Sequence, residues 1–441
     1  MDAKKSYEKY LSAYRRREKF ITLLYIGDGD LLFPFLDLFG ANQLRLTNRG
    51  IKELVSKFRW KDRTPVLNLP RWRLAFPNAI VCVVHISVAL TAVNAPYLVG
   101  CKEVSVVCRD SRAEAAFRFL KGVRKLTLAI IGDKINADAA FAHLAGIHTL
   151  DLNGCRQITD AAFAHLAGIH ELNMRYCNQE TITDAAFAHL AGIHELNMSY
   201  CNQETITDAA FAHLAGIHTL KMLRCELPIT DAAFMHLRGI HTLNLSGCGQ
   251  LPITDAAFAH LAGIHTLDLS GCRQITDAAF AHLRVNSHSI HTLNMSYCNQ
   301  ETITDAAFAH LAGIHTLIMD RCNQKTITDA AFAHLAGIHT LSMSRCWQET
   351  ITDAAFAHLA GIHTLNMSCC QQETITDAAF AHLAGVHELV MAGCIQKTIT
   401  NAAFSHLVGI KILNIHGRGR STIWSDEFAR LEGVKWSVDE P

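Results

Sequence analysis

The sequence predicts an α/β solenoid, a protein built by stacking many copies of one short helix–strand unit. The segment that begins at Ile182 recurs almost unchanged, mostly at intervals of 24 residues, and a period in the twenties is typical of solenoids. Each copy also passes from helical to strand spacing of its apolar residues. A diverged copy begins at Ile135, and the clear copies begin at Ile158, Ile182, Ile206, Ile229, Ile253, Ile275, Ile303, Ile327, Ile351, Ile375 and Ile399.

The first half of each copy predicts a helix of about two turns. In the copy that begins at Ile182, Asp184 is the expected N-cap. Phe187 and Leu190 are three residues apart and share one face, and Gly192 suits the left-handed position after the helix. So short a helix is marginal alone in water, so we expect neighbouring copies to stabilise it.

The second half of each copy predicts a short strand with one buried face. Leu196 and Met198 alternate with Glu195, Asn197 and Ser199, which is the period of a strand. Stacking would then bury the repeated apolar positions in one continuous core. In this copy the expected core residues are Ile182, Phe187, Leu190, Ile193, Leu196, Met198 and Cys201.

The spacing of Ile193, Leu196, Met198 and Cys201, followed by Ile206-Thr207-Asp208, resembles the cysteine-containing subclass of leucine-rich repeats. This subclass is typical of F-box/LRR proteins, and the resemblance covers residues 125–418. It implies a curved parallel sheet on the concave side and short helices on the convex side.

Residues 28–64 resemble a degenerate F-box, with an apolar helix that ends in Phe35-Leu36-Asp37, a second helix over residues 44–55, and Trp60. Gly27-Asp28-Gly29-Asp30 stands where most F-boxes begin with Leu-Pro. The resemblance implies docking on the Skp-type adaptor of a cullin ubiquitin ligase. A helical cap on the first repeat is the alternative. The candidate adaptor-binding residues are Leu32, Phe35, Leu36 and Leu46.

We expect four regions: a helical, F-box-like segment at 1–64, diverged repeats at 65–130, tandem repeats at 131–417 and a C-terminal cap at 418–441. Within the diverged region, residues 104–106 and 126–128 are predicted strands and residues 113–120 a predicted helix. The basic residues around the start of this region are expected to form a solvated face. They are Arg59, Lys61, Arg63, Arg71 and Arg73.

The charge balance and the apolar segments of the chain indicate which partners it is expected to bind. The chain of 441 residues carries 40 basic and 40 acidic side chains, whereas nucleic-acid binding favours a basic surface. Residues 1–20 lack the apolar core of a signal peptide. The apolar run at residues 79–93 is interrupted by His85 and Ser87 and is too short to span a bilayer. We therefore expect a cytoplasmic or nuclear protein that binds neither nucleic acid nor membrane.

Cysteine and histidine recur with the repeat. Eleven of the 15 cysteines occupy one position, from Cys155 to Cys394, where we expect a small buried side chain. A ladder of disulfides or metal ions is the alternative. The 26 histidines include a column at the strand starts, represented by His194. Packing and capping, a pH-responsive column and a multi-metal surface all remain open for it.

A near-identical array offers the same groups a dozen times and no singular catalytic constellation. We therefore expect no enzymatic activity, cofactor or metal site, and a binding role instead. The informative residues are those that break the repeated pattern, although drift after duplication also explains them. The candidate protein-binding residues are Leu223, Arg224, Ile318, Asp320, Arg321, Arg345 and Trp347. Three functions remain open: a substrate receptor of the F-box/LRR kind, an LRR scaffold without a ligase role, and a sensor of pH or metal ions that uses the histidine column.

Overall fold

A computed structural model describes residues 41–42, 49–131, 135–283, 290–415 and 435–436. The chain divides into two compact units, Met1–Leu172 (unit 1) and Asn173–Pro441 (unit 2). The candidate adaptor-binding residues lie outside the described residues, as do most of the predicted C-terminal cap and residues 284–289. Within the described part of the chain, no helix is long and apolar enough to cross a membrane.

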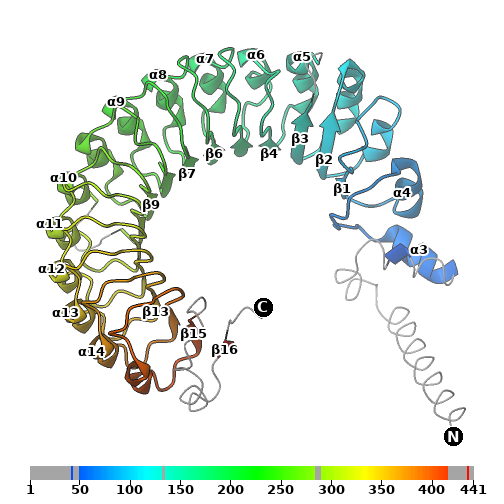
Figure 1. Ribbon diagram of the computed structural model, residues 1–441. Coiled ribbons are helices and arrows are strands. Elements are labelled where there is room, and N and C mark those ends of the chain that lie inside the picture. Colours follow the sequence, from blue (N-terminus) through cyan, green and yellow to red (C-terminus); the bar gives the residue numbers. More distant parts are fainter. Residues whose placement is uncertain (1–40, 43–48, 132–134, 284–289, 416–434, 437–441) are drawn as a thin grey trace, which may run out of the picture. The chain divides into compact units, whose positions relative to one another are not determined.

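Unit 1 alternates short helices with parallel strands (Figure 1). Its strands are β1 (Val81–Val83), β2 (Glu103–Cys108), β3 (Lys125–Ile130) and β4 (Thr149–Asp151), each parallel to the next. Strand β5 (Glu171–Asn173) lies at the boundary between the units. The helices are α3 (Arg49–Lys57), α4 (Leu69–Ala75), α5 (Ala137–Phe141) and α6 (Asp160–Phe163), with 3₁₀ helices η2 (Ala95–Leu98), η3 (Ser111–Leu120) and η4 (Ala142–Leu144). The strands predicted at residues 104–106 and 126–128 are confirmed within β2 and β3, and the helix predicted at 113–120 is confirmed as part of η3.

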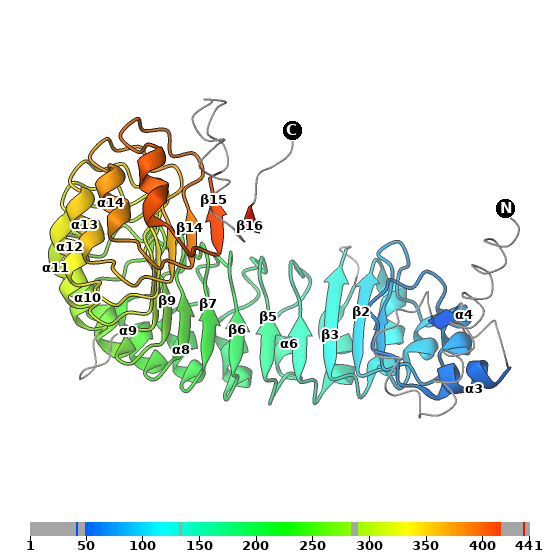
Figure 2. The ribbon, with the colours of Figure 1, turned by 90° about the horizontal axis from the view of Figure 1, so that it is seen from below.

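Unit 2 repeats the same arrangement with greater regularity (Figure 2). Its strands are β6 (Glu195–Asn197), β7 (Thr219–Lys221), β8 (Thr242–Asn244), β9 (Thr266–Asp268), β10 (Thr292–Asn294), β11 (Thr316–Ile318), β12 (Thr340–Ser342), β13 (Thr364–Asn366), β14 (Glu388–Val390), β15 (Ile412–Asn414) and β16 (Lys435–Trp436). The α-helices are α7 (Asp184–Phe187), α8 (Asp208–Phe211), α9 (Asp231–Phe234), α10 (Asp277–Ala281), α11 (Asp305–Ala309), α12 (Asp329–Ala333), α13 (Asp353–Ala357) and α14 (Asp377–Ala381). The 3₁₀ helices are η5 (Ala188–Leu190), η6 (Ala212–Leu214), η7 (Met235–Leu237), η8 (Asp255–Leu261) and η9 (Asn401–His406).

Neighbouring strands of unit 2 pair in parallel and in the repeat register, so that Thr292 pairs with Thr316 and Thr316 pairs with Thr340. The strands line the inner side of the curve and the helices lie on its outer side (Figure 1). We call the solvent-facing side of these strands, together with the turns that follow them, the strand face. Because the register is constant, equivalent side chains of successive repeats form columns along this face.

The predicted core is confirmed in the copy that begins at Ile182. Ile182 and Phe187 are fully buried, and so are Leu196 and Met198. The helix is confirmed as two short pieces, α7 followed by η5, and Gly192 has the left-handed φ of +82° that was predicted for it. Each repeat therefore contributes one apolar layer to the core of its unit.

The predicted N-cap is wrong by one residue. Thr183 caps α7, since its hydroxyl accepts a hydrogen bond from the backbone N–H of Ala185. Asp184 is the first residue of the helix, and its carboxylate instead accepts hydrogen bonds from the backbone N–H and the hydroxyl of Thr207, both at 2.7 Å. The acidic side chain thus connects one repeat to the next.

The predicted burial of the repeated cysteines is confirmed for all eleven, and the chain's 15 cysteines are free thiols. The Cys225 thiol donates a hydrogen bond of 3.0 Å to the carbonyl of Met198 in the preceding repeat. Burial raises the pKa of the Cys225 thiol to about 12, so it stays protonated at neutral pH. These thiols serve packing and hydrogen bonding within the core.

The prediction of a solvated basic face is wrong for Arg73. Its guanidinium donates hydrogen bonds of 2.6 to 3.1 Å to the carbonyls of Tyr97, Pro77, Ala79 and Val99. A guanidinium has five donors in a rigid fork, which suits it to hold several chain segments at once. Arg73 therefore joins the end of α4 to the segment around η2.

Candidate functional site

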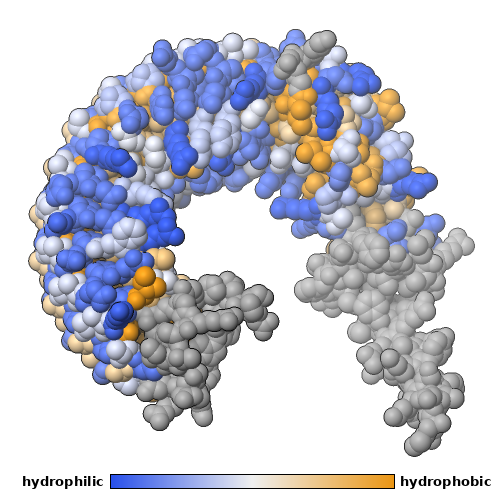
Figure 3. All heavy atoms as spheres, viewed as in Figure 1, coloured by the Kyte–Doolittle hydropathy of each residue, from blue (hydrophilic) through white to orange (hydrophobic). Residues whose placement is uncertain are grey.

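The strand face of unit 2 is mostly polar. Figure 3 views unit 2 from the edge of the curve, and the surface visible there is largely hydrophilic, with hydrophobic residues in small separate areas. The polar groups bind one another: the Asn244 amide donates to the Asp268 carboxylate at 3.3 Å, and the backbone N–H of Ser246 donates to Asn244 at 2.9 Å. Such a hydrated face has few of the aromatic and arginine side chains that contribute most to protein binding. Positions where the repeated polar pattern changes are therefore the candidates for a binding site.

One interruption is a column of residues that directly precede the repeat cysteines, here called the corner column. Each lies in a tight turn; for Tyr200 the turn closes with the Cys201 N–H bound to the Met198 carbonyl at 3.1 Å. All of these residues have positive φ, between 51° and 74° in unit 2. The column comprises Tyr176, Tyr200, Arg224, Gly247, Gly271, Tyr297, Arg321, Arg345, Cys369 and Gly393.

The corner conformation suits glycine, because a turn with positive φ at its third residue crowds any Cβ. A side chain in this left-handed region costs about 1–2 kcal/mol per residue. Gly247 and Gly271 avoid that cost, whereas Tyr200 and Arg224 do not. Seven repeats of unit 2 thus retain a side chain at a position where glycine would fold without strain.

Aromatic and guanidinium groups stack along the corner column. The rings of Tyr176 and Tyr200 stack with centroids 4.5 Å apart and planes inclined by 29°. The guanidinium of Arg175 lies 4.7 and 4.8 Å from these two centroids. Further along, the Arg321 guanidinium lies 4.9 Å from the Tyr297 ring centroid. These cation–π contacts fix the side chains in place on the surface.

Between the two stacks lies a hollow of about 820 Å³. Gly247 and Gly271 occupy its corner positions, so two successive side chains are missing from the column. Its wall includes the half-buried aliphatic side chains of Leu223 and Ile318. The complete lining is Tyr200, Leu223, Arg224, Ser246, Gly247, Gly249, Gln250, Asp268, Ser270, Gly271, Arg273, Asn294, Ser296, Tyr297, Ile318 and Asp320.

The carboxylates of the hollow already have hydrogen-bond partners, whereas its two guanidinium groups have none within the described part of the chain. The Asp268 carboxylate accepts from the backbone N–H of Ser270 at 2.9 Å as well as from Asn244. The Asp320 carboxylate accepts from the Ser342 hydroxyl at 2.6 Å and the Ser344 N–H at 2.9 Å. Arg224 and Arg273 are exposed, and neither guanidinium has a hydrogen bond or ion pair to any residue that the structure describes.

Four of the seven candidate binding residues meet at this hollow, namely Leu223, Arg224, Ile318 and Asp320. Arg321 stacks on Tyr297 at its edge. Arg345 is exposed in the corner column, farther from the hollow. Trp347 lines a separate hollow of about 560 Å³, where its indole N–H donates to the Cys369 carbonyl at 2.7 Å. Whether these residues bind a ligand stays a prediction.

Sequence reasoning missed the tyrosines and glycines of this site. A signal was available, because the residue before the repeat cysteine is glycine in some copies and tyrosine or arginine in others. An exchange of glycine for tyrosine or arginine at one repeat position indicates a backbone with positive φ. It also indicates that the side chain differs for a reason other than folding.

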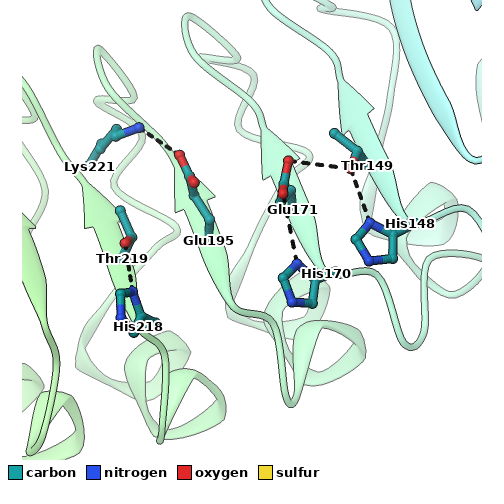
Figure 4. Close-up of polar contacts among 8 residues, drawn as sticks. All are labelled: His148, Thr149, His170, Glu171, Glu195, His218, Thr219 and Lys221. Atoms are coloured by element: carbon teal, nitrogen blue, oxygen red, sulfur yellow. Dashed lines mark hydrogen bonds and ion pairs between the residues drawn. The ribbon is translucent and has the colours of Figure 1, made fainter. Parts of the chain in front are cut away.

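A second column consists of the histidines that precede the strands. From His194 to His387, nine rings stack face to face with centroids 4.4 to 4.5 Å apart. The Nδ1 of His218 lies 3.1 Å from the Thr219 hydroxyl, and Figure 4 shows this contact as a dashed line. Close by, the Glu195 carboxylate pairs with the Lys221 ammonium at 2.6 Å. The predicted column of stacked rings is confirmed.

The histidine stacking does not suit a metal ion shared by adjacent rings. Stacked rings point their nitrogens in the same direction, whereas an ion needs lone pairs that converge on it at about 2.0–2.1 Å. Among the described residues, no group of three or more His, Cys, Asp or Glu side chains could hold a metal ion. Burial and the neighbouring histidines lower the pKa values of His218, His265 and His315.

No family model matches the chain, and no curated protein matches it. Many solved structures do. The Toll–Spatzle complex of Drosophila matches with 16% identity and a TM-score of 0.52 over 81% of this chain and 50% of the other chain. Its glycosylated form matches with 15% identity and a TM-score of 0.54 over 86% and 57%. The match thus covers 50% and 57% of the lengths of these two chains.

The fold is a leucine-rich-repeat solenoid. The parallel sheet, the short helices and the similarity to leucine-rich-repeat structures agree on this point. A further match, the yeast Rad7–Elc1 complex, has 15% identity and a TM-score of 0.43 over 84% of this chain and 95% of the other. At such identities the likeness concerns the leucine-rich-repeat fold alone.

Proposed function

We propose that this leucine-rich-repeat protein binds another protein through the strand face of unit 2, with the hollow at the centre of the contact. The observation that carries the proposal is the corner column, where exposed or half-buried tyrosines and arginines occupy a backbone conformation that favours glycine. Strained residues of this kind cluster at functional sites. Tyrosine and arginine are also among the residues that contribute most at protein interfaces.

We further infer that the bound protein is a substrate for ubiquitination. The F-box resemblance of residues 28–64 supports this role, with the candidate adaptor-binding residues docking on a Skp-type adaptor. Trp60, the last residue of the resemblance, is buried, and its indole N–H donates to the Val55 carbonyl at 2.7 Å. A fixed apolar anchor after α3 is compatible with the resemblance. Ubiquitin transfer would be performed by partner proteins.

The second candidate function is a binding scaffold without a ligase role. The near-identity of the repeats favours it, since Thr266, Thr292, Thr316 and Thr340 occupy one register position on four successive strands. A surface adapted to one ligand is expected to vary more from repeat to repeat. The two functions share the strand face and differ in what the N-terminal segment binds.

Binding of a purified Skp-type adaptor to the full chain separates the two functions. We expect the wild-type chain to capture the adaptor and the double variant Leu32→Asp/Phe35→Asp to lose it. The matched control is Leu74→Asp, because Leu74 is an apolar residue of α4 that is 82% exposed. Absence of adaptor binding by the wild-type chain would exclude the receptor role and leave the scaffold.

A further inference from the structure

We infer that the hollow holds a loop of the partner protein that carries aspartate or glutamate side chains, bound by Arg224 and Arg273 between walls formed by Tyr200 and Tyr297. The inference rests on the proposed binding role of the strand face and adds the chemistry of the partner. It follows from the width of the gap, from the state of its charged groups and from the position of Arg224.

The gap is wide enough for a segment of chain. Strands in a sheet lie about 4.8 Å apart, and Arg224 and Tyr297 are three repeats apart in the corner column. Their backbones are therefore separated by roughly 14 Å, with only Gly247 and Gly271 between them. The volume of about 820 Å³ also exceeds what one side chain needs. A partner loop can thus enter with its backbone.

The charged groups of the hollow favour an acidic loop over a basic one. The carboxylates of Asp268 and Asp320 already accept hydrogen bonds from neighbouring groups. The guanidinium groups of Arg224 and Arg273 keep their donors for a ligand. Arginine binds carboxylates with two parallel hydrogen bonds, which are stronger than those between neutral groups.

The glycine beside Arg224 determines where that side chain lies. A Cβ placed on Gly247 would come within 2.6 Å of Arg224 Cγ, so the arginine lies across the glycine and towards the gap. Glycine at this corner therefore does more than remove a side chain. It lets the neighbouring guanidinium project into the hollow.

The walls supply apolar contact for the rest of the loop. The ring of Tyr297 is exposed and held by Arg321, and the half-buried Leu223 and Ile318 lie in the same lining. Aromatic side chains fixed before binding lose little conformational freedom when a ligand arrives. An acidic residue next to an aliphatic or aromatic residue would match this arrangement.

Selection of random octapeptides displayed on phage against the immobilised full chain tests the inference. We expect the recovered sequences to be enriched in Asp and Glu relative to the starting library. The variant Gly271→Tyr should weaken their binding at least about 10-fold, because the ring would fill the hollow. The φ of +72° at Gly271 strains any side chain, but a Cβ there meets nothing closer than 3.8 Å. Tyr297 adopts the same conformation, with φ of 62°, at the same repeat position, so the variant should still fold.

The control Gly154→Tyr places the same side chain at the same repeat position in unit 1, where a Cβ has nothing within 4 Å. It should bind the peptides as the wild type does. The charge-reversed variant Arg224→Glu/Arg273→Glu should select peptides rich in Lys and Arg instead. Circular dichroism of each variant confirms that it is folded.

Three results would overturn the inference. Peptides without acidic enrichment, or peptides that bind Gly271→Tyr as tightly as the wild type, would refute the acidic loop and leave protein binding by the strand face intact. Failure to recover any specific peptide, with the wild-type chain folded, would count against both the acidic loop and the proposed binding role.

Discussion

The carboxylate of Asp329 accepts two hydrogen bonds from Thr352 in the next repeat, one from its backbone N–H and one from its hydroxyl, both at 2.7 Å. The Thr352 hydroxyl in turn accepts from the N–H of Ala354 and so caps helix α13. One aspartate therefore positions the cap of the following helix. Most of the described repeats carry the same pair, as between Asp305 and Thr328.

Replacing Asp329 with Ala should destabilise the chain by about 1–3 kcal/mol, because the partly buried donors of Thr352 lose their partner. Urea unfolding followed by circular dichroism measures the change. Asp329→Asn should cost less, since an amide oxygen still accepts one hydrogen bond; Asn401 occupies this position in a later repeat. An unchanged stability of Asp329→Ala would show that the pair does not join the repeats.

Replacing Phe187 with Ala should cost about 3–5 kcal/mol, because the phenyl ring is fully buried and its loss leaves a cavity in one layer of the core. Since each repeat contacts only its neighbours, hydrogen exchange should accelerate first in the adjoining layers. Leu74→Ala, at a highly exposed leucine, is the control and should leave the stability unchanged. Identical melting of Phe187→Ala and the wild type would place Phe187 outside the core.

Replacing Gly192 with Val should destabilise the chain through the backbone alone. A Cβ at this glycine meets nothing within 4 Å, but φ is +82°, a conformation that is an outlier for a β-branched residue. Gly192→Asn should be tolerated better, since asparagine enters the left-handed region more readily. Thermal melting of the two variants checks the order, and equal stability of Val and Asn would contradict it.

The histidine column should make the chain less stable in acid. The folded-state pKa values of His218, His265 and His315 are lowered by burial and by neighbouring imidazoles. The unfolded chain, with pKa values near 6.5, therefore binds more protons as the pH falls. Linkage then requires stability to decrease as the pH falls from about 7 through 6.5 and below.

Melting temperatures between pH 8 and pH 5 measure this dependence, and the triple variant His218→Gln/His265→Gln/His315→Gln should flatten it. The other charged group near His218 is Glu195, which raises the pKa of His218 in part. As a control, glutamine at the exposed helix histidines His189, His213 and His334 leaves the column intact. A wild-type chain whose melting temperature does not fall in acid would contradict the repulsion.

Much of the fold follows from the sequence because each repeat carries its own helix and strand periods. The identity of the N-cap residue does not follow from the sequence. Both Thr183 and Asp184 are favoured capping residues, so local sequence cannot choose between them. The choice depends on Thr207 in the next repeat, which binds the Asp184 carboxylate. Contacts between repeats decide what the isolated repeat leaves open.

The candidate site was predictable in part. Leu223 and Ile318 depart from the repeated letters and could be found by comparing copies, and both line the hollow. The hollow itself could not be found in this way, because it consists of missing side chains at Gly247 and Gly271. Two glycines far apart in the sequence become one gap only when the strand register places them side by side. Arg73 was misjudged for a similar reason, since its partners lie on segments distant in sequence.

The most direct test of the account replaces corner residues of the hollow with the glycine that their backbone favours. In Arg224→Gly/Tyr297→Gly, relief of left-handed strain, about 1–2 kcal/mol per residue, should offset the entropy cost of glycine, about 0.5–1 kcal/mol each. We predict a free energy of unfolding that is unchanged or higher, with the binding of selected acidic peptides lost. A loss of about 2 kcal/mol or more with peptide binding retained would contradict the account, since these residues would then serve folding and not recognition.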